Sequence, residues 1–111
     1  MTLVDTSVWI DHFRNGNPRL RDLLEEGEVV THPMVLGELA CGNLARRAQT
    51  LRLLARLPRI PQVADPLVLQ AIESRRLFGE GIGWIDAHLL TAALLSSVGF
   101  WTLDRRLGRL I

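Results

Sequence analysis

The sequence contains no lysine, although 13 of its 111 residues are basic, so all 13 are arginines. This absence excludes mechanisms that need a lysine amine: P-loop phosphate binding, Schiff-base formation and phosphoryl transfer through a phospho-aspartate. With 12 acidic residues the formal net charge is only +1, so overall charge does not indicate a nucleic-acid partner. Arginine is nevertheless suited to bidentate contact with phosphate groups.

Cysteine occurs once, at Cys41, which excludes a disulfide within the chain and argues against a cysteine-ligated zinc site. Such sparse use of cysteine is typical of a reducing cytosol. The N-terminus lacks the basic stretch followed by an apolar stretch that marks a signal peptide. The longest uncharged apolar run, residues 89–101, is too short to span a bilayer. We therefore expect a cytoplasmic protein without a membrane segment.

Short apolar runs alternate with helical patterns along the chain. This alternation implies right-handed crossovers and a parallel sheet covered by helices. We predict one domain over residues 1–111, an α/β fold in which a three-layer α/β/α sandwich surrounds a mainly parallel sheet of four to five strands. The strands are predicted at residues 3–4, 29–30, 58–61 and 100–103. The helices are predicted at residues 6–13, 18–27, 33–41, 44–57, 65–78 and 85–98, with a short one after 104.

Four acidic residues have positions that point to one site. Asp5 and Asp104 each follow a predicted strand, and the carboxyl ends of parallel strands are where such sheets bind ligands. Glu38 lies in the otherwise apolar stretch "PMVLGELAC", on the helix after the second strand. Asp86 lies in the first turn of the most apolar helix. Both helices begin at the same edge of the sheet, so we expect all four carboxylates to face one crevice.

Taken singly, each acid has a structural explanation. Asp5 and Asp104 fit helix N-caps, Asp86 fits a first-turn acid that interacts with the helix dipole, and Glu38 fits a solvated helix position. Placing all four carboxylates close together is energetically costly, because clustered like charges need a compensating positive charge and no lysine exists to supply it. Carboxylate oxygens are the ligands that Mg²⁺ and Mn²⁺ prefer. The pattern therefore predicts a divalent-cation site.

The segments that carry these acids resemble the PIN-domain family and, among its bacterial members, the VapC toxins of toxin–antitoxin pairs. The matching segments are "LVDTSVWIDHF", "GELACG", "WIDAHLLTAA" and "FWTLDRRL". They are spread over essentially the whole chain, and their combination is specific. The resemblance implies an endoribonuclease that depends on Mg²⁺ or Mn²⁺ and cuts structured RNA, such as tRNA or rRNA. It also implies a homodimer and a small VapB-like antitoxin that plugs the active site.

Carried over to this sequence, the family's acidic site falls on Asp5, Glu38, Asp86 and Asp104. Asp5, Asp86 and Asp104 would hold the cation, with Glu38 as a further ligand or as the residue that orients the attacking water. Thr6, Ser7 and Thr102 match hydroxyl positions that hold the carboxylates or a water. Beside the site, Arg105, Arg106 and Arg109 could contact the RNA backbone, or could form a solvated helix face.

Two other functions and one structural departure complete the sequence-based expectations. Phosphoryl transfer through an aspartyl intermediate fails, because Ser7 stands where a second aspartate is needed and lysine is absent. The alternative to a nuclease is a non-catalytic module with a PIN-like fold that binds RNA or protein and uses the acids to pair with arginine on another chain.

Family members usually continue beyond the residue that matches Ile111 into a last edge strand, so we expect that strand to be missing here or supplied differently.

Overall fold

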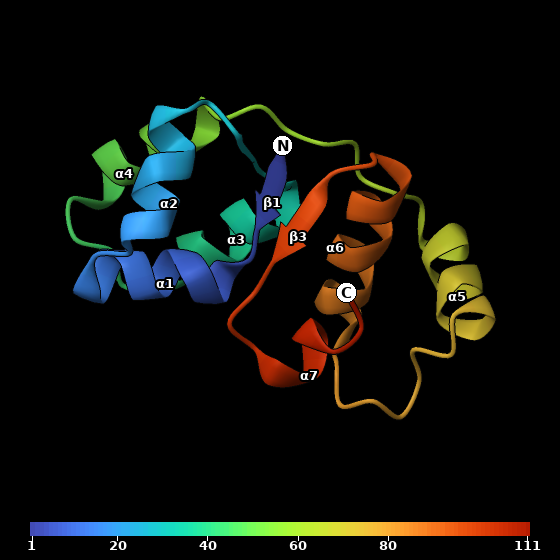
Figure 1. Ribbon diagram of the computed structural model, residues 1–111. Coiled ribbons are helices and arrows are strands. Elements are labelled where there is room, and N and C mark those ends of the chain that lie inside the picture. The colour runs from blue at the N-terminus through green and yellow to red at the C-terminus, as the bar shows by residue number, and fades with distance from the viewer.

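The computed structural model describes residues 1–111, in which three short strands alternate with seven helices. Figure 1 shows α1 and α2 on one side of β1 and β3, with α5 and α6 on the other side. The α/β class predicted from the sequence is confirmed. The strands are β1 (Thr2–Val4), β2 (Val29–Val30) and β3 (Gly99–Trp101). The helices are α1 (Thr6–Asn15), α2 (Pro18–Glu25), α3 (Pro33–Cys41), α4 (Arg47–Ala55), α5 (Asp65–Ser74), α6 (Trp84–Leu95) and α7 (Arg105–Gly108).

The sheet has three strands in the order β2-β1-β3, all parallel, so the prediction of four to five strands is wrong. The segment expected as an edge strand at residues 58–61 makes a single bridge, between Thr31 and Arg59. Pro58 and Pro61 flank this bridge and have no N–H to donate, so a ladder cannot extend past them. The pairing is limited to two hydrogen bonds, from Thr31 N–H to Pro58 O and from Ile60 N–H to Thr31 O.

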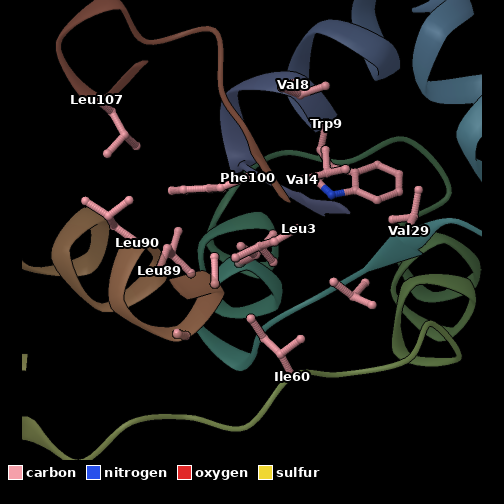
Figure 2. Close-up of a cluster of buried hydrophobic side chains, with 14 of the residues drawn as sticks. Leu3, Val4, Val8, Trp9, Val29, Ile60, Leu89, Leu90, Phe100 and Leu107 are labelled. Atoms are coloured by element: carbon pink, nitrogen blue, oxygen red, sulfur yellow. The ribbon is translucent and has the colours of Figure 1, made fainter. Parts of the chain in front are cut away.

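Both faces of the sheet are buried, as is usual for parallel strands. Leu3 and Phe100 are register partners on β1 and β3, and they pack toward α6 near Leu89 (Figure 2). The next residue of β1, Val4, faces the other way and lies beside Trp9 of α1. These side chains belong to one apolar cluster of 18 buried residues. The cluster fixes β1 and β3 between helices and therefore fixes where both strands end.

Several helices end or begin at positions that the sequence pattern did not predict. The helix predicted at residues 65–78 ends at Ser74, because Arg76 adopts a left-handed conformation with φ of 54°. The helix predicted from residue 44 begins at Arg47, after Arg46 with φ of 48°. Glycine usually occupies such backbone positions, so neither arginine was recognisable as a helix boundary.

The strand order determines where a ligand site can form. The chain leaves the central strand β1 toward β2 and later returns to β3 on the opposite side of β1. In open parallel sheets the crevice lies at such a reversal, outside the carboxyl ends of the two adjacent strands. Here those ends are Val4 and Trp101, which are register partners. No helix of the protein has both the length and the apolar character that crossing a bilayer requires.

We expect Leu89→Ala to lower the free energy of unfolding by about 2–5 kcal/mol, because the truncated side chain is fully buried between α6 and the sheet. Leu95→Ala on the same helix is the matched control, since Leu95 is 67% exposed, and it should change stability by less than about 0.5 kcal/mol. Urea unfolding followed by circular dichroism measures both. Equal losses in the two variants would contradict the placement of α6.

Candidate active site

Asp5 follows the central strand and is held there by two hydroxyl groups. Its side chain is 6% exposed, and its Oδ2 accepts hydrogen bonds from Ser7 Oγ at 2.7 Å and from Thr102 Oγ1 at 2.8 Å. Its backbone N–H donates to Trp101 O at 2.9 Å, which continues the pairing of β1 with β3. The two hydroxyl oxygens lie 3.3 Å apart. Each hydroxyl has one proton, and the shorter contacts to Asp5 indicate that both protons point to the carboxylate.

The same two hydroxyls fasten the segment between β3 and α7 to the first turn of α1. Ser7 Oγ accepts from the Leu103 N–H at 3.0 Å, and Thr102 Oγ1 accepts from the Asp104 N–H at 3.0 Å. Each hydroxyl therefore accepts from a backbone amide while it donates to Asp5. This arrangement brings residues from the two ends of the chain together and places Asp104 next to the end of β1.

Glu38 is joined to the site through the neighbour of Asp5. Thr6 Oγ1 donates to Glu38 Oε1 at 2.8 Å, which connects the first turn of α1 to α3. Val35 and Leu39 are the buried residues of α3, and their spacing places Glu38 at the edge of the buried face, where it is half-buried. The adjacent hydroxyls of Thr6 and Ser7 thus bind two different acids.

Asp86 lies in the first turn of α6 and caps that helix. The Gly83 N–H donates to Asp86 Oδ2 at 3.0 Å. Burial is the main cause that raises the pKa of Asp86 above its ordinary value, while the bond from Gly83 lowers it and the nearby charges of Asp5 and Asp104 raise it further. The charges of Asp5 and Asp104 are thus close enough to Asp86 to affect its pKa.

Asp104 is the N-cap of α7 and is exposed. Its Oδ1 accepts from the Leu107 N–H at 3.0 Å, and Leu107 is fully buried beneath the short helix. The N-cap role that the sequence allowed for Asp104 is therefore confirmed.

The four acids suit a hard divalent cation, because they offer carboxylate oxygens as ligands and negative charge. In each of them one oxygen accepts a hydrogen bond from the protein and the other has no donor. No arginine pairs with any of them, since the two ion pairs of the structure join the Met1 amine to Glu28 and His88 to Asp65. As placed, however, no three side chains of Asp, Glu, His or Cys lie close enough to hold one ion. Local hydrogen bonds, including the two helix caps, set the present positions of the four side chains.

The three arginines expected beside the site lie on or next to α7, and all are exposed. Arg106 differs from Arg105 and Arg109 because its side chain lies against Gly81, in the loop before α6. A Cβ placed on Gly81 would be 2.7 Å from Arg106 Cδ and 3.0 Å from its Nη1. None of the three arginines forms an ion pair.

Two buried histidines near these helices were not assigned a role from the sequence. His88 Nε2 contacts Asp65 Oδ1 at 3.0 Å, which ties α6 to α5. His32 caps α3 by accepting from the Met34 N–H at 3.0 Å, and its position before Pro33 was the available signal. Burial, followed by the proximity of His88, lowers the pKa of His32. Its Nε2 has no partner.

A cleft between α1 and α3 lies beside Glu38. Besides Glu38, the cleft is lined by four apolar residues and by three that are small or polar. Glu38 is the only one of the four site acids among the lining residues. The lining residues are Ile10, Phe13, Arg14, Glu38, Leu39, Gly42, Asn43 and Leu44.

Comparison with known proteins gives the context for this arrangement. The family model described as "PIN domain" matches residues 2–110. The chain belongs to the PIN-domain family. Two relatives, both named Ribonuclease VapC32, come from Mycobacterium tuberculosis strains CDC 1551 / Oshkosh and ATCC 25618 / H37Rv. Each is 46% identical over 108 residues, which cover 96% of this chain and 87% of the relative. The resemblance to PIN domains of the VapC type is thereby confirmed.

The raised pKa of Asp86 predicts a dependence of stability on pH. The folded state holds this proton more tightly than the unfolded state, so the stability contribution is present below the unfolded pKa of 3.8 and is lost as pH rises through the folded pKa. Without divalent cations, Asp86→Asn should therefore be more stable than wild type at pH 7, and the difference should vanish below pH 3.8. Asparagine can still accept the hydrogen bond from Gly83.

Urea unfolding in EDTA between pH 3 and pH 7 measures this effect. Asp22→Asn is the matched control, because Asp22 is exposed on α2 and removal of its charge relieves no cluster. If wild type were as stable as Asp86→Asn at pH 7, burial and the neighbouring charges would not raise the pKa of Asp86 in the folded protein.

Proposed function

We propose that this PIN-domain protein is a metal-dependent endoribonuclease and the toxin of a toxin–antitoxin pair, which hydrolyses phosphodiester bonds of tRNA or rRNA. The observation that carries the proposal is the set of four carboxylates around the ends of β1 and β3, each with one oxygen free of protein donors and none paired with an arginine. The high identity to proteins named as ribonucleases supports the same activity.

Asp5, Asp86 and Asp104 are the residues that would hold Mg²⁺ or Mn²⁺, with Glu38 as a further ligand or as the residue that orients water. When bound, the cation supplies a Lewis acid that activates water and neutralises charge on the phosphodiester. The protein's own residues orient the carboxylates that would bind the cation. Ser7 and Thr102 hold one oxygen of Asp5 by hydrogen bonds and thereby orient its other oxygen. Hydrogen-bonded neighbours of ligating carboxylates have this role in metal sites.

Glu38 is oriented in the same way by Thr6, and its free Oε2 is available to accept a proton from the attacking water. Arg105, Arg106 and Arg109 would contact the RNA backbone, since guanidinium groups bind phosphate oxygens through several donors. The shared field of Asp5, Asp86 and Asp104 favours binding of a cation for the same reason that it raises the pKa of Asp86.

The proposal includes the protein's partners and setting. Residues 1–111 would act as one domain, because the buried apolar side chains form one cluster. The protein would be a cytoplasmic homodimer that meets both its RNA substrate and a VapB-like antitoxin there. Leu67 and Leu69 on α5 are more than half exposed, and association with a second copy is one way to cover such apolar surface.

Cleavage of labelled total tRNA and rRNA by the purified protein tests the activity. We expect cutting with Mg²⁺ or Mn²⁺, none with EDTA, and a loss of more than about 100-fold in Asp5→Asn, because asparagine keeps the hydrogen bonds from Ser7 and Thr102 but loses the charge. By linkage, the cation should also raise the melting temperature of wild type more than that of Asp5→Asn. Neither cutting nor cation binding would instead favour the non-catalytic binding module.

Thr102→Val tests how the orientation of the Asp5 carboxylate contributes to function while its charge is kept. Valine has nearly the same shape as threonine but cannot donate to Asp5 or accept from the Asp104 N–H, so we expect activity or cation affinity to fall about 10- to 100-fold. Thr50→Val is the control, because Thr50 lies on the distant α4 and its hydroxyl donates only to the nearby Ala45 O. Activity and calorimetric cation binding are measured for both, and equal behaviour would show that Thr102 does not act through Asp5.

A further inference from the structure

Arg106 has a different environment from the other arginines near the acids. Its side chain lies across Gly81, and a Cβ at that glycine would meet Arg106 Cδ at 2.7 Å, Nη1 at 3.0 Å and Nε at 3.2 Å. No other glycine of the chain has a side chain or backbone atom closer than 3.4 Å to such a Cβ. The absence of a side chain at Gly81 therefore leaves room for this placement of the long, exposed side chain of Arg106.

This contact joins the segments that carry two of the four acids. Arg106 lies two residues after Asp104, and Gly81 lies two residues before Gly83, whose N–H caps Asp86. The guanidinium group thus lies between the segments of Asp104 and Asp86. It forms no hydrogen bond and no ion pair, so all five of its N–H donors are available to an anion.

We propose that Arg106 contacts the phosphate that is cleaved and stabilises the negative charge that develops on it, and that Gly81 is the positioning residue that lets it do so. The proposal rests on the ribonuclease function proposed above and adds a specific residue to it. A planar fork of donors matches phosphate oxygens in two-point contact, and donors held in place before the reaction stabilise developing charge most effectively. Neither Arg105 nor Arg109 lies against a glycine in this way.

Kinetics of RNA cleavage by the purified protein test this assignment. Arg106→Ala should lower kcat about 100-fold or more, because the contact strengthens as charge develops, whereas Arg105→Ala should mainly raise KM. Arg106→Lys keeps the charge but loses the fork, so it should restore RNA affinity without restoring kcat. A kcat for Arg106→Ala within about threefold of wild type would overturn the proposal.

Gly81→Ala tests the positioning role with a close control in the same loop. Gly79 has φ of 73° and Gly81 has φ of 81°, so alanine strains both positions alike, but a Cβ on Gly79 meets nothing within 4 Å. Gly81→Ala should lower kcat while Gly79→Ala leaves it unchanged, and Gly81→Ala combined with Arg106→Ala should be no worse than Arg106→Ala alone. Equal losses in the two glycine variants would mean that loop strain, and not Arg106, is responsible.

RNA binding by the inactive Asp5→Asn protein separates failure of this inference from failure of the proposed function. The salt dependence of binding to a labelled RNA reports the number of phosphate contacts, and loss of Arg106 should reduce the slope by about one contact. An unchanged slope would overturn the contact even if wild type cleaves RNA. A wild-type protein that cleaves nothing, with a slope that still falls, would overturn the ribonuclease function and leave the phosphate contact standing.

Discussion

The two hydrogen bonds that converge on one oxygen of Asp5 are the interaction on which the site depends. They come from Ser7 on α1 and from Thr102 after β3, and each donor also accepts a backbone N–H from the segment that leads into α7. Without them the end of β3 would be attached to the end of β1 by strand pairing alone, and β3 has only three residues. The acid that would bind a cation is therefore also the acceptor that closes the fold, so its charge serves structure and chemistry together.

The crevice owes its position to features that can be recognised in a sequence. Apolar runs ending in Asp5 and Asp104 were sufficient to predict that both acids follow parallel strands, whose carboxyl ends lie at one edge of the sheet. That all four acids form one cation site stays a prediction, because no three of the side chains lie close enough to hold one ion. The number of strands was not predictable in this way. Whether residues 58–61 form a ladder or one bridge depends on the N–H groups that two prolines lack, and a count of extended residues does not include that.

What could not be predicted depends on contacts between distant elements. Arg46, Arg76 and Ser97 adopt left-handed conformations that their residue types do not favour, so packing on either side sets those helix ends. Asp65 resembled a local helix cap, yet it reaches across to the buried His88, and the choice between these partners is made by the packing of α5 on α6. Local patterns thus located the acids, while tertiary structure decided what orients them.

The connection between Ser7, Asp5 and Thr102 also bears on how the protein is made. The donors and the acceptor are separated by up to 97 positions, so the site joins segments of the chain that are synthesised at different times. Contacts of such long sequence separation form late in folding, because the intervening chain must be ordered first. A ribosome that has not yet added Thr102 and Asp104 carries an Asp5 without its partners. Because the proposed toxin activity needs Asp5 in place, this order of assembly would delay that activity until Thr102 and Asp104 have been added.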